Sequence, residues 1–237
     1  MLKVKNLTVE YSSEKNLNDI NLTVDNSSVV AVLGENQSGK SLLLKTIANC
    51  DSEHGGQVVI NHFKAETEPD KAKLIMSYSP EIPDIPKQLT GFEYLELVAN
   101  IYDLNSTDRI SAINNLADIL DIKDKLQTTI EYLSFATRKK ISVIAAFLAD
   151  RPVVLLDNPT LFQDYFSQQA IKQLIINRKE SCSILVATND LIFAEDIADK
   201  FVFIKNGEIF AAGTIDELSH QAQTKKSIEQ IYKQILG

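Results

Sequence analysis

Long apolar runs are absent from this sequence. None approaches the about 18 residues that a membrane-spanning helix needs. The first residues, MLKVKNLTVEY, alternate like a strand and lack the apolar core of a signal peptide. The composition, 44% hydrophobic and 24% charged, is ordinary for a soluble globular protein. The length of 237 residues therefore predicts one large domain, or one domain with an inserted subdomain.

Cysteine and histidine are also scarce. The two cysteines, Cys50 and Cys182, are far apart and form no pair motif, so we expect buried thiols in a reducing cytosol. The three histidines, His54, His62 and His220, are scattered without the spacing of metal ligands. These residues therefore receive no functional role.

Basic residues are fewer than acidic residues. Lysine and arginine number 24 against 32 acidic residues, which gives a net charge of −8, and the sequence pI is near 5.0. Nucleic-acid partners are held mainly by Lys and Arg, so we expect no nucleic acid as the main ligand. The local basic run Arg138-Lys139-Lys140 is interpreted as a solvated helix face.

The stretch Gly34–Ser41, GENQSGKS, has the spacing G-x-x-x-x-G-K-[ST] of a phosphate-binding loop. It follows the apolar run 29–33 and precedes another at 42–44, which begins a helical pattern. Strand, glycine-containing turn and helix therefore occur in the order that this loop requires. We expect a nucleoside triphosphate as the ligand.

Each residue type in the loop has a chemical reason. Gly34 and Gly39 let the backbone curl closely around an anion, and the N–H groups at the helix N-terminus point at the phosphates. Lys40 can neutralise phosphate oxygens, and the Ser41 hydroxyl can join a Mg²⁺ shell. The expected nucleotide-binding residues of the loop are Gly34, Glu35, Asn36, Gln37, Ser38, Gly39, Lys40, Ser41 and Leu42.

The remaining patterns alternate between strand and helix and predict an α/β fold with a largely parallel sheet. Strands are expected at 2–10, 20–25, 29–33, 58–60, 73–78, 153–156, 183–188, 201–205 and 208–212, with a polar turn at 12–18. Helices are expected from 41 to about 49 and at 91–102, 107–120, 134–149, 163–179, 191–198 and 227–236. Between Pro86 and Asp150 only helical patterns occur. Asn206-Gly207 is a strong hairpin signal. Thr214 with Glu217 predicts the capping box of a C-terminal helix.

The apolar run 153–156 ends in Asp157. A carboxylate at the carboxyl end of a buried strand lies beside the phosphate loop, where it can hold a Mg²⁺ water. Such a run is weak evidence alone, but it becomes strong in combination with the loop. Ser41 and Asp157 are therefore candidate metal ligands.

In their order along nearly the whole chain, these motifs resemble the ATP-binding subunits of ABC transporters. Tyr11 stands where the family has an aromatic residue that stacks on adenine. Residues 77–81 (SYSPE) resemble the family's Q-loop with Glu81 in place of Gln, and 155–160 (LLDNPT) resemble LLDEPT. Asp164 stands at the D-loop aspartate, and Asn189 stands at the histidine of the A-T-H-D switch. Residues 89–95 and the terminal helix are similar to drug- and antibiotic-export members.

The resemblance implies a P-loop NTPase (RecA-like) core with a mostly parallel sheet, an N-terminal antiparallel β region and an inserted helical subdomain. The whole chain, 1–237, would be a single ABC-type ATP-binding domain. Its core would cover about 1–86 and 151–213, its helical subdomain about 87–150 and its C-terminal helical segment about 214–237.

The resemblance also implies cofactors and partners. The cofactors are ATP and Mg²⁺, with Ser41, Glu81 and Asp157 as metal ligands. A second ATP-binding subunit, identical or different, would pair head to tail, so that Ser134 contacts the ATP bound by the partner. An integral membrane permease subunit would hold the protein at the cytoplasmic face of the membrane. The membrane partner and the transported substrate are not encoded in any residue of this chain.

Three departures from the family pattern bear on catalysis. The signature LSGGQ reads LSFAT, so Phe135 and Ala136 add side chains where a phosphate must come close to the backbone. The catalytic glutamate is Asn158, an amide that cannot accept a proton, and general-base catalysis is worth roughly 10²–10⁴-fold. The switch histidine is Asn189. Gln37 also replaces a glycine that is usual in the loop.

We therefore interpret the chain as an ATP-binding subunit of an exporter-like ABC transporter, with weak or absent hydrolysis. One alternative is a pseudo-ATPase, a nucleotide-gated scaffold or regulator that closes on ATP without hydrolysing it. A second is a soluble non-transport member of the family, although such proteins usually carry two cassettes or bind nucleic acid. The sequence leaves these alternatives open.

Overall fold

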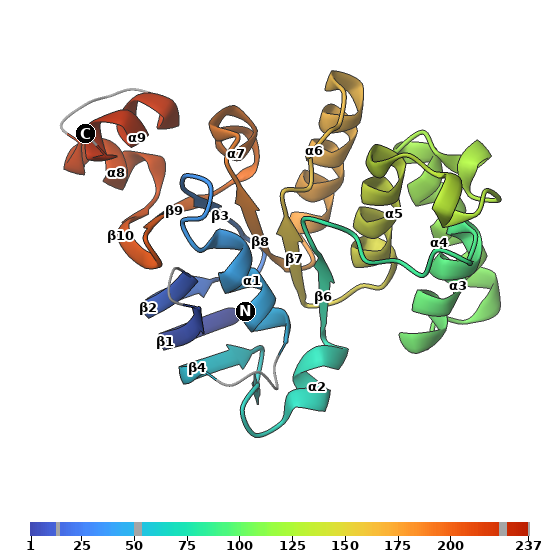
Figure 1. The fold of residues 1–237 in the computed structure, drawn as a ribbon, viewed down its shortest axis with the longest axis horizontal. Helices are drawn as coiled ribbons and strands as arrows, with labels where there is room; N and C mark the ends of the chain where they lie inside the picture. The colour runs from blue at the N-terminus through green and yellow to red at the C-terminus, as the bar shows by residue number, and fades with distance from the viewer. Residues whose placement is uncertain (13–14, 50–53, 223–226, 237) are drawn as a thin grey trace.

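The computed structural model describes the backbone of residues 1–12, 15–49, 54–222 and 227–236. The side chain of Tyr11 lies outside the described part, as does Cys50, so the expectations for both stay predictions. Two β-sheets face each other across helix α1, and a separate group of helices lies to one side (Figure 1). In the described residues no helix combines the length and apolar character needed to cross a bilayer.

The central sheet has six strands in the order β10-β9-β3-β8-β7-β6. Neighbouring strands from β9 to β6 are parallel, and β10 is antiparallel to β9. Every residue of β3, β7 and β8 is buried, because helices cover both faces of the sheet. The strands are β3 Val29–Leu33, β6 Met76–Ser79, β7 Val153–Asp157, β8 Ser183–Thr188, β9 Lys200–Lys205 and β10 Glu208–Gly213.

The second sheet is antiparallel, with the order β2-β1-β4-β5. Its strands are β1 Leu2–Ser12, β2 Lys15–Val24, β4 Gly55–Ile60 and β5 Phe63–Lys64. Helix α1, Lys40–Ala48, fills the space between the two sheets with Leu43, Leu44 and Ile47, which are fully buried. The expected α/β class, with a mostly parallel sheet and an antiparallel N-terminal β region, is confirmed.

Helices α3 (Gly91–Ile101), α4 (Ser106–Ile119) and α5 (Phe135–Leu148) lie between β6 and β7 in the chain, with short 3₁₀ turns at Lys123–Lys125 and Ile130–Tyr132. Polar caps fix their starts: Thr90 forms a capping box with Glu93, and Asn105 caps α4. Apolar residues of the three helices share one core with the sheet. The described part of this segment contains no strand, as expected, and has only an isolated bridge between Thr90 and Thr129.

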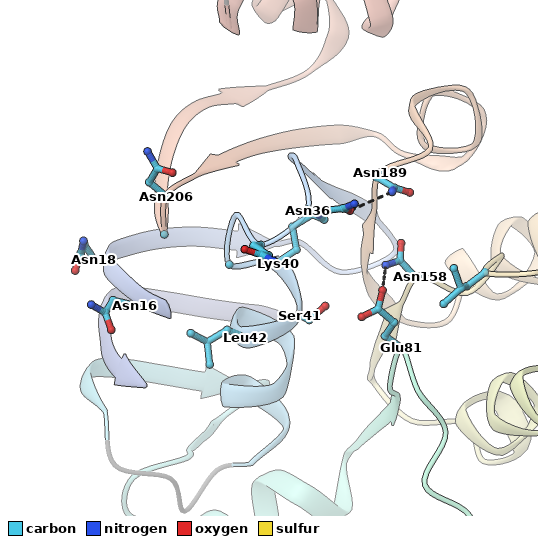
Figure 2. Close-up of a pocket in the computed structure, with 14 residues that line it drawn as sticks. Asn16, Asn18, Asn36, Lys40, Ser41, Leu42, Glu81, Asn158, Asn189 and Asn206 are labelled. Atoms are coloured by element: carbon cyan, nitrogen blue, oxygen red, sulfur yellow. Dashed lines mark hydrogen bonds between the residues drawn. The ribbon is translucent and has the colours of Figure 1, made fainter. Parts of the chain in front are cut away.

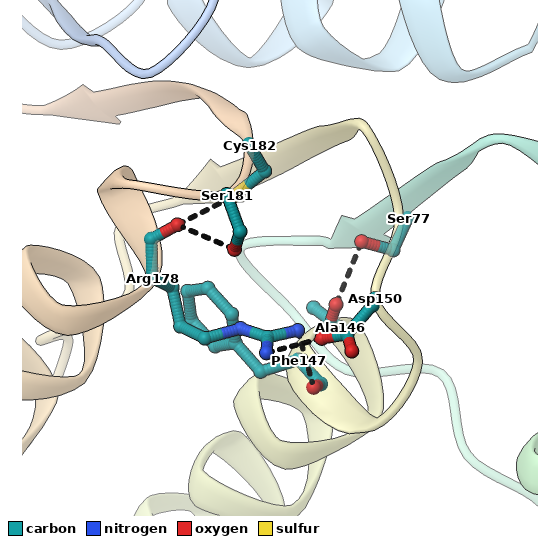
Figure 3. Close-up of polar contacts among 7 residues, drawn as sticks. All are labelled: Ser77, Ala146, Phe147, Asp150, Arg178, Ser181 and Cys182. Carbon is teal, nitrogen blue, oxygen red and sulfur yellow. Dashed lines mark hydrogen bonds and ion pairs between the residues drawn. The ribbon is translucent and has the colours of Figure 1, made fainter.

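Figure 3 shows how the end of α5 is fixed to the central sheet and to α6 (Tyr165–Lys179). The Ser77 hydroxyl of β6 donates to the carbonyl oxygen of Ala146 at 2.7 Å. The Arg178 guanidinium of α6 donates to the carbonyl oxygen of Phe147 at 3.3 Å and forms an ion pair with Asp150. The helical segment is thus tied to the core where the chain enters β7.

The remaining helices are α2 (Pro69–Leu74), α7 (Leu191–Ile197), α8 (Ile215–Gln221) and α9 (Ile228–Leu236). Helices α8 and α9 lie near β9 and β10 (Figure 1), where Leu218 and Ile231 pack with Phe203. The Cys182 thiol is buried and donates to the carbonyl oxygen of Arg178 at 3.1 Å, which confirms a buried thiol at this position.

Some expected boundaries were wrong. Residues 73–74 end helix α2 rather than begin a strand, because Pro69 opens a helical turn and β6 begins only at Met76. Strand β2 starts at Lys15, inside the expected turn, because 15–17 pair with β1. Strand β4 begins at Gly55, three residues before the expected start at residue 58. Helix α4 begins one residue before its expected start.

Candidate functional site

Strand β3 delivers the chain to the loop Gly34–Gly39, and α1 begins at Lys40. Gly39 has φ +111°, a conformation that side chains rarely adopt. A Cβ on Gly34 would lie 2.3 Å from the carbonyl oxygen of Ile204, so only glycine fits against β9. These contacts give the loop its tight curl.

The Lys40 side chain folds back over the loop. Its ammonium donates to the carbonyl oxygens of Gly34 at 2.8 Å and Glu35 at 2.7 Å, and more distantly to the Ser38 hydroxyl at 3.5 Å. Burial lowers the pKa of Lys40, and the nearby carboxylates, of which Asp157 contributes most, oppose that shift. The cation is held by oxygen acceptors of the kind that a phosphate also offers.

Ser41 and Asp157 meet at the start of α1 and the end of β7. The Ser41 hydroxyl donates to a carboxylate oxygen of Asp157 at 3.1 Å. Burial raises the pKa of Asp157 to about 6, against the effects of the Ser41 hydrogen bond and of Lys139 and Lys40. A bound cation would stabilise the ionised form of this buried carboxylate.

These two oxygen donors fit Mg²⁺. That ion usually takes one or two protein oxygen groups and completes its shell with water and phosphate oxygens. Among the described residues, no group of three or more His, Cys, Asp or Glu side chains could hold a metal on its own. Ser41 and Asp157 could supply the protein oxygens of a Mg²⁺ ion that is bound together with a nucleotide.

Glu81 and Asn158 are joined directly. The Asn158 side-chain amide donates to a carboxylate oxygen of Glu81 at 2.6 Å (Figure 2). Both side chains are half-buried. Asn158 has φ +44°, a region where asparagine is enriched, and its backbone N–H donates to Ala187 of the neighbouring strand at 2.8 Å. The pair comes from the segments that follow β6 and β7.

These residues line one cavity of about 720 Å³, within the usual size range of ligand sites. Figure 2 shows side chains from both sheets converging on it. The expected site residues that line it are Asn36, Gln37, Gly39, Lys40, Ser41, Leu42, Glu81, Asn158 and Asn189. Asn189 is exposed, and its amide donates to the Asn36 side chain at 3.5 Å.

Gly34, Glu35, Ser38 and Asp157 do not line the cavity, although they belong to the loop or bond to it. Ser134 and Asp164 also do not line it, and both are exposed. Ser134 caps α5, where its hydroxyl accepts from the N–H of Thr137 at 3.1 Å. Asp164 caps α6 by accepting from the N–H of Ser167 at 2.8 Å, and these hydrogen bonds lower the pKa of Asp164.

The β9–β10 hairpin also lines the cavity and was missed as a site element. Its turn, Asn206-Gly207, was expected, and the structure confirms it. The Gly207 N–H donates to the carbonyl oxygen of Ser38 at 2.9 Å, and the N–H of Asn18 donates to Gly207 at 2.9 Å. Asn16 and Asn18 of β2 lie beside the hairpin and complete the cavity wall. No sequence signal could locate a hairpin against a loop that precedes it by more than a hundred residues.

Lys139 was expected on a solvated helix face, which is wrong. It is fully buried, and its ammonium donates to the carbonyl oxygens of Pro80 and Asp157, each at 2.6 Å. Burial lowers the pKa of Lys139 to about 8, against the raising effects of Asp157 and Glu81. The charge is tolerated because carbonyl oxygens and two nearby carboxylates surround it.

At the start of α5, the ring of Phe135 packs edge-on against the ring of Phe162 with centroids 5.3 Å apart. The Gln163 side-chain amide donates to the carbonyl oxygen of Ala136 at 3.0 Å. The N-terminus of α5 and the loop after β7 are therefore in direct contact.

Comparisons with known proteins agree with this geometry. A family model described as ABC transporter matches residues 17–161. The ABC-type transporter ATP-binding protein EcsA of Bacillus subtilis is 27% identical over 99% of this chain and 96% of its own. A solved ATP-binding subunit of an ABC transporter superposes with TM-score 0.93 at 28% identity, with both chains fully covered.

A more distant structure shows the same fold. The dimeric ATP-binding cassette MJ0796, solved with ADP and phosphate bound, has TM-score 0.78 at 22% identity over 90% of this chain and 98% of its own. The likeness of fold thus extends to a cassette that assembles as a dimer.

Proposed function

Since this chain belongs to the ABC transporter family and is an ATP-binding subunit, we propose that it binds ATP with Mg²⁺ firmly, hydrolyses it weakly, and works in an exporter-like transporter. The observation that carries this proposal is a binding apparatus left intact beside an altered catalytic position. Lys40 and Ser41 line one cavity, the buried Asp157 is hydrogen-bonded to Ser41, and residue 158 is an amide.

The binding half of the proposal assigns roles to residues. The loop Gly34–Leu42 surrounds the phosphates, and Lys40 exchanges carbonyl acceptors for phosphate oxygens. Ser41 and Asp157 hold Mg²⁺, with Glu81 as a candidate third oxygen donor, and the bound cation neutralises charge on the phosphates. Tyr11 stacks on the base.

The second part of the proposal concerns a partner subunit and the residues that lie outside the cavity. A second ATP-binding subunit, identical or different, pairs head to tail so that Ser134 at the N-terminus of α5 faces the partner's ATP. Asp164 lies on the same surface. The exposed positions of both residues are compatible with such a contact.

The membrane permease subunit docks on the helical segment of about 87–150 and on the linker before it, which places the protein at the cytoplasmic face. Ile82, in the linker between β6 and α3, is 70% exposed. An exposed isoleucine in an irregular segment is apolar surface available to a partner.

The test is equilibrium binding of ATP in Mg²⁺ by calorimetry, followed by measurement of phosphate release. Wild type should bind, Lys40→Ala should lose binding, and the exposed Lys64→Ala should serve as the matched control. Asn158→Glu should raise phosphate release by roughly 10²-fold or more if the rest of the site is competent. A wild type that fails to bind ATP–Mg²⁺ would contradict the proposal.

A second candidate function is an ATP-gated scaffold without any hydrolysis. The Phe135–Phe162 contact favours it, because aromatic rings occupy the helix N-terminus that would meet the partner's phosphate. Phosphate release that is readily measured in wild type and lost in Asp157→Asn would exclude this candidate.

A further inference from the structure

We propose that Glu81 supplies the carboxylate that orients the attacking water and accepts its proton, in place of residue 158. This inference rests on the proposed function, because it concerns how the residual hydrolysis of ATP occurs. It assigns Glu81 a catalytic role and leaves Asn158 as the group that positions it.

The first support is the direct hydrogen bond between the two side chains. The Asn158 amide donates to Glu81 at 2.6 Å, so the carboxylate is held next to the position where the family pattern has its glutamate. Both residues line the cavity that contains Lys40 and Ser41. In the family pattern the amide follows β6 and the acid follows β7. Here the acid, Glu81, follows β6, and the amide, Asn158, follows β7.

The second support is the way both segments are fixed. The buried ammonium of Lys139 donates to Pro80, the residue before Glu81, and to Asp157, the residue before Asn158. One side chain of α5 therefore holds the backbone immediately ahead of each member of the pair. A pair of residues whose preceding backbone is held by one side chain has the preorganisation that catalytic groups need.

The step balances as a simple displacement. The water oxygen forms a bond to the γ-phosphorus, and the bond from that phosphorus to the β–γ bridging oxygen breaks, leaving ADP and phosphate. The proton lost by the water passes to the Glu81 carboxylate, which later returns it to solvent or to the phosphate. Asn158 donates its amide hydrogen to Glu81 and changes no bond.

The competing role for Glu81 is to bind Mg²⁺ only. The two roles differ in what Glu81→Gln does to binding. Loss of a metal ligand weakens Mg²⁺-dependent ATP binding, whereas loss of a proton acceptor leaves binding intact and stops hydrolysis. The Gln side chain keeps the size of Glu and an oxygen that can accept from Asn158.

The experiment uses four forms of the full chain: wild type, Glu81→Gln, Asn158→Glu and the double variant. Phosphate release, ATP–Mg²⁺ affinity and the ratio of ATP to ADP that remains bound after incubation are measured for each. We expect Glu81→Gln to release phosphate at least about 10²-fold more slowly, to bind ATP within about threefold of wild type, and to retain ATP as the bound species. The double variant, whose carboxylate is at position 158, should recover turnover.

Thermal unfolding of each variant confirms that it is folded, and Glu66→Gln is the control for loss of a carboxylate elsewhere. The inference is overturned if wild type binds ATP but releases no phosphate, if Glu81→Gln keeps wild-type turnover, or if its affinity falls in parallel with its rate. It is also overturned if the double variant stays inactive. Failure of wild type to bind ATP at all would instead contradict the proposed function.

Discussion

The ring of Phe135 meets the ring of Phe162 edge-on, with centroids 5.3 Å apart. By the motif resemblance, the first residue stands at a glycine of the family signature. The second has φ +57°, a backbone conformation that suits glycine, and is 73% exposed. Two positions that favour glycine for independent reasons thus carry aromatic rings that contact each other. The contact is worth about 0.5–1.5 kcal/mol beyond burial of the rings, by the usual energies of aromatic pairs.

The strain at residue 162 predicts an unusual order of stability. A left-handed conformation costs a residue with a Cβ about 1–2 kcal/mol, and glycine avoids this cost. Phe162→Gly should therefore be more stable than Phe162→Ala by about 1 kcal/mol in urea denaturation. Both substitutions remove the ring, so the difference between their unfolding free energies reports the backbone strain alone.

Phe166 provides the control for that comparison. It is exposed and lies in the first turn of helix α6, where the helical backbone favours alanine over glycine by up to about 1 kcal/mol. Phe166→Ala should be the more stable of its pair, the opposite order to residue 162. The same order at both positions would contradict strain at Phe162.

The aromatic contact also predicts how the subunits associate. The double variant Phe135→Gly, Ala136→Gly removes the side chains that hinder approach of a phosphate to the N-terminus of α5. In the Glu81→Gln background, which prevents the loss of ATP by hydrolysis, this change should raise ATP-dependent dimer formation at least about tenfold, or 1.4 kcal/mol. Sedimentation with ATP and with ADP measures it. Leu97→Ala on α3 should leave dimer formation unchanged, and an equal gain with ADP would count against the prediction.

Lys139 predicts a pH dependence of stability. Burial lowers its pKa from 10.5 to about 8 in the folded protein, so between these pH values the unfolded chain binds more protons. The free energy of unfolding contributed by this group therefore rises with pH across that window. Between pH 7.5 and 9.5 the gain should be about 2 kcal/mol relative to Lys139→Met.

Urea denaturation at the two pH values measures this difference. The exposed Lys64→Met should show the same pH dependence as wild type. A difference between wild type and Lys139→Met that does not change with pH would show that the buried ammonium titrates near its ordinary pKa.

Gly207 predicts an indirect effect on nucleotide binding, through the phosphate loop that its N–H supports. A Cβ there would lie 2.0 Å from the carbonyl oxygen of Asn16, and the residue has φ +77°. Gly207→Ala should cost about 1–3 kcal/mol of unfolding free energy and displace the N–H that donates to Ser38. ATP affinity measured by calorimetry should fall at least about tenfold. Gly55→Ala, whose Cβ would have ordinary contacts beginning at 3.6 Å, should change neither quantity.

Local patterns predicted the parts of the structure that depend on neighbours in sequence. Strand β3, the Gly34–Ser41 loop and α1 followed from one motif, and the capping box of Thr214 with Glu217 marked the start of α8. The Asn206-Gly207 turn placed the last hairpin. In each case, the backbone conformation is decided by the few residues that carry the signal.

Features that depend on distant contacts could not be predicted in this way. Lys139 belongs to a basic run, and only the carbonyl oxygens of Pro80 and Asp157 make its burial possible. The Asn158–Glu81 hydrogen bond joins residues 77 positions apart. A sequence pattern shows which side chains are present, but not which acceptors the fold brings to them.

The support of the phosphate loop by β9 and its hairpin has a consequence for the order of events during synthesis. Gly34 fits against the carbonyl of Ile204, and Ser38 receives its hydrogen bond from Gly207. When the loop has been synthesised and has left the ribosome, Ile204 and Gly207 have not yet been made, so the loop lacks both of these contacts. Domains generally fold as units during synthesis, and this binding site is finished only when almost the last strands have been made. Fragments that stop before residue 200 should contain the entire motif and still bind no nucleotide.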